Sequence, residues 1–202
     1  MRVACLHTAA SNIAVFDDAA RDAAPGLMLS HLVVPQWLAE AEEAGGMTAG
    51  QRVRLGEFIQ ALTPFFDAIL ITCSTLGAVT ADFPRHASSC RVVRSDEMLA
   101  NAVSVPQGKT VVLCAAPSTV EATSALFGLP AERIGGAWDA FKTGNSERYI
   151  TLIADAVSNA LDQGAQQVVL AQVSMAPAAR LFPGDKRVKV IPEAALKGLL
   201  SL

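Results

Sequence analysis

The sequence predicts an α/β protein built from two pseudo-symmetric lobes, each a mostly parallel sheet flanked by helices. Short apolar runs of strand length alternate with longer amphipathic segments, which is the pattern of a parallel sheet covered by helices. Two pairs of strand-like segments also recur in the same order along the chain, which indicates an internal duplication. A chain of 202 residues is long enough for one compact domain or for two small lobes that share an interface.

Eight short apolar runs are expected to form the strands. They cover residues 3–7, 29–34, 68–72, 91–93, 111–115, 133–137, 168–171 and 188–191. Capping residues indicate where helices begin between them. Thr48 and Gln51 have capping-box spacing ahead of apolar residues at helical intervals, and Ser118 and Glu121 form a second box. Ser146 is expected to cap another long amphipathic helix.

The duplication rests on two pairs of segments. Residues 69–76 (ILITCSTL) and 168–175 (VVLAQVSM) are apolar strands that end in a small polar cluster. Residues 3–11 and 111–119 pair in a similar way. Any two buried strands can look alike, but two pairs in the same order at similar offsets favour a duplication.

The duplication sets the expected domains. We expect a first lobe over residues 1–95 and a second over residues 96–191, with a C-terminal helix over 192–202 packing back on the first. Loops at the carboxyl ends of strands are where open α/β sheets bind ligands, so two such halves would place a site in the cleft between them.

Composition and charge exclude several classes of protein. The net charge is −3, from 16 basic and 19 acidic residues with no basic run, so no nucleic-acid surface is expected. Apolar residues make up 51% and charged residues 17%, which is typical of a folded chain. No apolar run approaches the roughly 20 residues of a membrane-spanning helix, and polar residues interrupt the N-terminus where a signal peptide would be apolar. We therefore expect a soluble, cytoplasmic protein without a membrane partner.

Cys73 is the strongest candidate for a reactive residue. The four cysteines show no CxxC spacing and are expected to be thiols. Cys73 ends an apolar strand before a turn into a helix, and a helix N-terminus stabilises a thiolate, so the sequence predicts a lowered pKa. The hydroxyls of Ser74 and Thr75 and the adjacent backbone amides are suited to hold a carboxylate. The alternative is a buried structural cysteine, which fits Cys5 and Cys114 better because both lie inside strands.

Other chemical motifs are weak. Cys5 and His7 point to one face of the first strand, which is half of a zinc ligand set. No second ligand pair with suitable spacing follows, and His31 and His86 are expected to stand alone, so no metal site is expected. The dinucleotide-binding and P-loop glycine patterns are absent from the sequence, and no cofactor is expected.

The strand followed by Cys-Ser-Thr at residues 69–75 resembles the first cysteine motif of the aspartate/glutamate racemase superfamily. That superfamily includes glutamate, aspartate and hydantoin racemases, maleate isomerase and arylmalonate decarboxylase. Further elements that resemble the family occur in its order, namely LHT at 6–8, AAPSTV at 115–120 and VIPEAAL at 190–196. The resemblance covers nearly the whole chain through short motifs. It implies two α/β lobes with the substrate in the cleft between them.

The resemblance also implies a function and a set of site residues. It implies a small carboxylate or amino-acid substrate, no cofactor and a homodimer, with Cys73 as the thiolate base or nucleophile at the α-carbon. The hydroxyls that it assigns to the substrate are those of Thr8, Ser11, Ser74, Thr75, Ser118 and Thr119. Helix capping explains the hydroxyls of Thr8, Ser11, Ser118 and Thr119 equally well, and the two roles can coincide.

The second cysteine of the family is missing. The segment VVLAQVSM places Gln172 at that position, or Val173 after a shift of one residue, and neither side chain titrates. We therefore expect a single-cysteine isomerase or decarboxylase-like lyase, with Gln172 and Ser174 lining the second half of the site. The alternative is a non-catalytic protein of the same fold that binds small carboxylates and has lost half of its chemistry.

Overall fold

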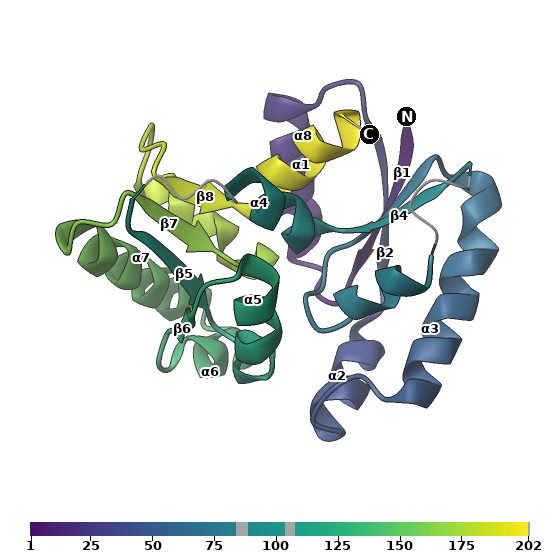
Figure 1. Cartoon of the computed structure of the whole chain (residues 1–202), viewed down its shortest axis with the longest axis horizontal. Helices are drawn as coiled ribbons and strands as arrows, with labels where there is room; N and C mark the ends of the chain where they lie inside the picture. Colours follow the sequence, from purple (N-terminus) through teal and green to yellow (C-terminus); the bar gives the residue numbers. More distant parts are fainter. Residues whose placement is uncertain (84–88, 104–107, 202) are drawn as a thin grey trace. The chain divides into compact units, whose positions relative to one another are not determined.

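The computed structural model describes residues 1–83, 89–103 and 108–201. The chain divides into two compact units, one formed by Met1–Glu97 with Pro192–Leu202 and the other by Met98–Ile191. Each unit contains one four-stranded sheet in which all neighbouring strands are parallel (Figure 1). Helices flank both sheets, which confirms the predicted α/β class.

The first sheet has the strand order β2-β1-β3-β4. Its strands are β1 (Arg2–His7), β2 (Met28–Val33), β3 (Ala68–Ile71) and β4 (Arg91–Arg94). From the central pair β1 and β3, the chain continues outward to β2 on one side and to β4 on the other. The carboxyl ends of β1 and β3 therefore form a topological switch point, the place where open α/β sheets bind ligands.

The second sheet repeats this topology with the order β6-β5-β7-β8. Its strands are β5 (Thr110–Cys114), β6 (Ala131–Arg133), β7 (Gln167–Leu170) and β8 (Val188–Val190). In this sheet β5 takes the place of β1, and β7 takes the place of β3, as the recurring sequence segments predict. A second switch point lies at the carboxyl ends of β5 and β7.

Helices of the first unit cover both faces of its sheet. They are α1 (Asn12–Ala23), α2 (Pro35–Glu43), α3 (Ala49–Leu62) and the C-terminal α8 (Ile191–Leu200), drawn in yellow in Figure 1. Leu55 and Ile59 of α3 pack in one core cluster with Leu6 and Ile71. Phe16 of α1 contacts the ring of His7, which lies on the opposite face because side chains alternate along a strand.

The second unit has a separate core. Its helices are α5 (Val120–Phe127), α6 (Ala137–Lys142) and α7 (Ser146–Asp162), and α4 (Ser95–Val103) contains the boundary between the units. Ile153 and Val157 of α7 are fully buried in one cluster with Leu113 and Leu170 of the sheet. Both cores consist mainly of Ala, Val, Leu and Ile, as expected for a chain with 5% aromatic residues.

Several predicted boundaries need correction. The strand expected at residues 133–137 lies at Ala131–Arg133, because two glycines follow Ile134 and α6 begins directly after them. Asn145, and not Ser146, caps α7 by accepting a hydrogen bond from the Arg148 N–H at 3.1 Å. All eight strands form close to the residues predicted.

Among the described residues, no helix combines the length and the apolar character needed to cross a membrane. All four cysteines lie within that part of the chain and are free thiols, as predicted.

The N-terminal caps of α3 and α1 give a test of the local structure. The Thr48 hydroxyl accepts a hydrogen bond from the Gln51 N–H at 3.1 Å, which confirms the predicted cap of α3. Thr48→Ala should lower the free energy of unfolding by about 1 kcal/mol in urea denaturation, because it leaves that N–H without its partner. Ser11→Ala is the matched control, because among the described residues its side chain makes no capping bond to α1. It should change stability by less than about 0.5 kcal/mol. Equal losses in both variants would contradict the assignment.

Candidate active site

Cys73 lies at the switch point of the first sheet, two residues beyond the end of β3. A turn over Ser74–Leu76 leads into a 3-10 helix, η2 (Gly77–Asp82), so no α-helix begins at the cysteine as the sequence predicted. The side chain is partly buried and packs against the core cluster that contains Leu6 and Ile71.

Four hydrogen-bond donors lie around the Cys73 sulfur. They are the hydroxyls of Thr8 and Thr75 and the backbone N–H groups of Thr75 and Leu76, of which the Leu76 N–H also donates to the Cys73 carbonyl at 3.2 Å. Burial raises the pKa of the Cys73 thiol above its usual value, and these donors only oppose that rise because they favour the thiolate. The prediction of a lowered pKa is therefore wrong, since removal of the thiol from water outweighs its donors.

The structure brings together two of the four predicted first-unit hydroxyls at the thiol. Thr8 directly follows β1 and Thr75 follows the cysteine, so both reach the sulfur from neighbouring strand ends. Ser11 and Ser74 occupy the same two loops. Ser11 is exposed, and because no capping bond is described for it, its hydroxyl is not committed to α1.

Sequence reasoning missed Arg94, which ends β4 next to β3. Its guanidinium binds Asp96 through two bonds of 2.7 and 2.9 Å, and their side chains are only 15% and 5% exposed. Burial opposes the charge, but the Asp96 hydrogen bonds and the negative charges of Asp96 and Glu97, together with that of Cys73 when it is a thiolate, raise the pKa of Arg94. The guanidinium also covers Gly77, where an added Cβ would lie 2.8 Å from Nε. Arg94 is thus a fixed positive charge within electrostatic range of the thiol, and only the strand order could have revealed it.

Asn12 is a second residue that the sequence did not single out. It begins α1, beyond the loop that carries Thr8, and its side chain is buried. Within the described part of the chain, its Oδ1 atom has no hydrogen-bond partner. A buried acceptor without a partner costs about 1–3 kcal/mol, so Asn12 is a candidate to receive a hydrogen bond from a ligand.

Gln172, at the position of the missing cysteine, supports the loops of the second switch point. Its Oε1 atom accepts hydrogen bonds from the N–H groups of Ala115 and Ala116 at 2.5 and 3.0 Å. Gln172 is buried, with 8% of the residue exposed, and these two bonds link the loop after β7 to the loop after β5. With Oε1 committed to the backbone, only the Nε2 donors of Gln172 are suited to meet a ligand.

The other second-unit candidates are largely committed to internal contacts. The Thr119 hydroxyl is buried and donates to the Ala116 carbonyl at 2.8 Å, and among the described residues it makes no capping bond to α5. The predicted capping box at Ser118 is therefore wrong, because the N-cap of α5 is Thr119.

The Ser174 hydroxyl shares a 2.8 Å hydrogen bond with the buried Tyr149. Ser118 is exposed on a short 3-10 turn.

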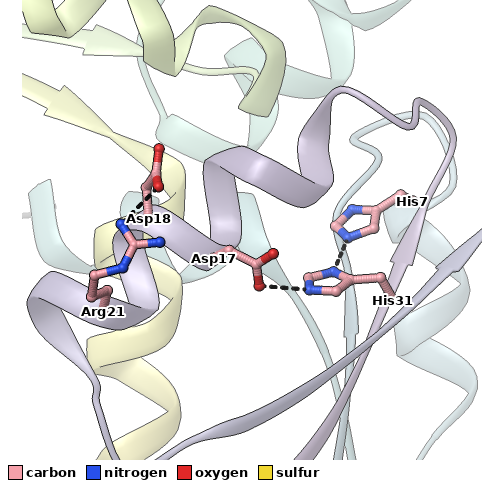
Figure 2. Close-up of polar contacts among 5 residues, drawn as sticks. All are labelled: His7, Asp17, Asp18, Arg21 and His31. Carbon is pink, nitrogen blue, oxygen red and sulfur yellow. Dashed lines mark hydrogen bonds and ion pairs between the residues drawn. The ribbon is translucent and has the colours of Figure 1, made fainter.

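A second polar cluster lies on the opposite face of the first sheet. His7 Nδ1 lies 2.8 Å from the Thr72 hydroxyl. Figure 2 shows the other two contacts, in which His7 Nε2 lies 2.9 Å from His31 Nδ1 and His31 Nε2 lies 3.0 Å from Asp17 Oδ1. Burial lowers the pKa of His7 to about 4, with a further contribution from His31 and an opposing one from Asp17. Burial also raises the pKa of Cys5, on the same face, to about 12. The prediction that His31 stands alone is wrong, and His86 lies outside the described residues.

No protein-family model matches the chain, and no curated protein matches it in sequence. Solved structures match it over nearly its whole length. The aspartate racemase of Picrophilus torridus superposes with a TM-score of 0.74 and 12% identity, over 99% of this chain and 93% of that one. The chain has the fold of the aspartate/glutamate racemases. This confirms, at the level of the fold, the resemblance predicted from the Cys-Ser-Thr segment.

Two further structures support the same fold. The allantoin racemase of Klebsiella pneumoniae superposes with a TM-score of 0.68 and 19% identity, over 100% of this chain and 87% of that one. The glutamate racemase of Thermus thermophilus, in complex with β-chloro-D-alanine, has a TM-score of 0.68 and 16% identity, over 99% and 79%. At these identities the superpositions show a shared fold only. The chemistry of this chain has to be inferred from its own residues.

The hydrogen bonds to Cys73 predict how its reactivity depends on pH. Thr8→Val removes one donor to the thiolate, so the pKa of Cys73 should rise further. Because the thiolate is the reactive form, the rate of iodoacetamide alkylation should then increase at a higher pH than in the parent protein. Mass mapping of the labelled peptides measures this rate for Cys73 alone.

Thr80→Val provides the matched control, since the Thr80 hydroxyl donates to the Gly77 carbonyl at 2.9 Å and not to the sulfur. It should leave the alkylation profile of Cys73 unchanged. An unshifted profile in Thr8→Val, or the same shift in both variants, would show that the Thr8 hydroxyl does not stabilise the thiolate.

Proposed function

We propose that this chain is a racemase-like enzyme that acts at the α-carbon of a small carboxylate or amino acid with Cys73 as its single reactive thiol. The observation that supports this most is the set of four donors around the Cys73 sulfur. A structural cysteine packs as a small apolar side chain and requires no such donors. Donors aimed at a sulfur stabilise a negative charge there, which is needed only if the thiol gives up its proton during a reaction.

The raised pKa of Cys73 favours the role of proton donor. At neutral pH the resting group is the thiol, which is an acid. In a decarboxylation of a substituted malonate, the bond from the α-carbon to one carboxylate breaks, CO₂ leaves, and the electron pair remains on the α-carbon. The Cys73 S–H then gives its proton to that carbon, and water returns a proton to the thiolate. The four donors and the charge of Arg94 would stabilise the thiolate formed in this step.

Inversion of an α-carbon by two cysteines requires an acid and a base on opposite faces of the substrate. Gln172 cannot supply the second group because an amide does not titrate. We therefore favour a lyase, or an isomerase that uses one thiol, over a two-base racemase. In this proposal the hydroxyls of Ser11 and Ser74 and the Oδ1 atom of Asn12 contact the substrate at the same switch point.

A non-catalytic carboxylate-binding protein is the second candidate. Two backbone N–H groups donate to Gln172 Oε1, and this favours the non-catalytic candidate. The Gln172 side chain holds loops together at the position where the family has a catalytic cysteine. Such a protein would retain the loops after β1 and β3 as a binding surface without turnover.

Turnover by the parent protein and by two cysteine variants tests the proposal. The panel contains aspartate, glutamate, hydantoins including allantoin, and substituted malonates, followed by exchange of the α-proton in D₂O and by release of CO₂. We expect at least one substrate to turn over, and Cys73→Ala to reduce its rate by at least about 100-fold. Cys114→Ala, which removes a buried strand cysteine of the second unit, should retain activity.

The outcomes separate the two candidates. Binding of a panel compound by both the parent and Cys73→Ala, with no turnover by either, would favour the non-catalytic protein. Turnover that Cys73→Ala leaves unchanged would contradict the role of the thiol, and a panel that is neither bound nor turned over would contradict both candidates.

A further inference from the structure

Three nitrogen and sulfur ligands gather on the face of the first sheet that looks away from Cys73. Cys5 and His7 share one face of β1 because side chains alternate along a strand. The parallel register places His31 of β2 directly beside Cys5. The Cys5 sulfur, one ring nitrogen of His7 and one ring nitrogen of His31 all lie within 4.8 Å of one another. This juxtaposition depends on the strand register, so the spacing in the sequence could not reveal it.

The hydrogen bonds around the two histidines fix where their protons lie. The Thr72 hydroxyl donates to the Leu6 carbonyl at 2.9 Å, so it can only accept from His7 Nδ1. That bond keeps the proton on Nδ1 and leaves a lone pair on Nε2 of His7. On the other ring, the carboxylate of Asp17 keeps a proton on His31 Nε2, because a carboxylate only accepts.

Consequently the two nitrogens that face each other at 2.9 Å, His7 Nε2 and His31 Nδ1, both direct lone pairs toward one point when the rings are neutral. Lone pairs repel unless a positive species lies between them, either an additional proton on His31 or a cation. The sulfur of Cys5 lies within 4.8 Å of a ring nitrogen of each histidine. The donor set of one thiol and two imidazoles is one that Zn²⁺ prefers, whereas Mg²⁺ and Ca²⁺ take oxygen ligands.

We propose that Cys5 Sγ, His7 Nε2 and His31 Nδ1 form a binding site for Zn²⁺. Three protein ligands leave the fourth tetrahedral position to water or another small donor. On binding, the Cys5 thiol releases its proton to solvent and binds as thiolate. Asp17 and Thr72 hold the far N–H group of each imidazole, which is the arrangement that orients zinc-bound histidines in proteins.

The site is reachable and is separate from the candidate active site. His31 lies on the edge strand β2 with 13% of its side chain exposed, and Asp17 is 50% exposed, so solvent reaches the outer end of the cluster. Figure 2 shows Asp17 extending from α1 toward the His31 ring, while the adjacent Asp18 pairs with Arg21 instead. Cys73 packs with the core on the other face, so the zinc site does not depend on the proposed function.

Metal analysis of chelator-treated protein after dialysis against Zn²⁺ tests the site. We expect about one zinc per chain in the parent and in the two control variants, Cys73→Ala and Cys114→Ala. Cys5→Ala and His31→Ala should retain background zinc only, with circular dichroism showing that they are folded. Asp17→Asn should weaken binding by about 10–100-fold, because the amide holds the imidazole less firmly than the carboxylate. Mg²⁺ should not compete.

Co²⁺ in place of Zn²⁺ gives a second measurement that does not require the Cys5 variant to fold. The parent and Cys73→Ala should show the near-ultraviolet charge-transfer absorption of a cobalt-bound thiolate. A parent that binds no stoichiometric zinc, or whose cobalt spectrum lacks the thiolate absorption, would overturn the proposal. Full zinc binding by Cys5→Ala or by His31→Ala would also overturn it.

Discussion

The parallel pairing of β1 with β3 determines where Cys73 and Thr8 meet and where Thr72 meets His7. The register sets Leu6 beside Ile71, so both strands end together and their following loops meet at the switch point. Alternation along the strands then separates the side chains by face. Cys73 packs with the core on the face of Leu6, and Thr72 turns toward His7 on the other face. A shift of β3 by one residue in this register would exchange its two faces, so Cys73 would leave the face of Leu6 and His7 would lose its contact with Thr72.

The elements could be predicted from the sequence because their signals are local. Apolar runs of strand length marked all eight strands, and Thr48 marked the start of α3. Ser118 failed as a cap because a 3-10 turn over Pro117–Thr119 precedes α5 and shifts its first residue. The loop motifs around Cys73 indicated the racemase fold, although only 12–19% of residues match the three racemases described above.

The electrostatics of the site could not be predicted because they depend on long-range contacts. The pKa of Cys73 reflects burial and a donor from Thr8, which lies 65 residues away in the sequence. Arg94 reaches the site through the β3–β4 pairing, and His31 joins Cys5 through the β1–β2 register. Gln172 illustrates the opposite case. The sequence correctly excluded an acid or base there, but the hydrogen bonds to Ala115 and Ala116 emerge only from the fold.

Protection of the Cys73 thiol by a bound carboxylate tests most directly whether Cys73 lies in a substrate site. The other three cysteines are buried, so iodoacetamide should label Cys73 first in the folded protein. Malonate or another dicarboxylate that binds should slow the alkylation of Cys73 and leave the rates of Cys5, Cys90 and Cys114 unchanged. Preferential labelling of Cys90, or a rate at Cys73 that no dicarboxylate changes, would contradict the assignment of Cys73 as the functional thiol.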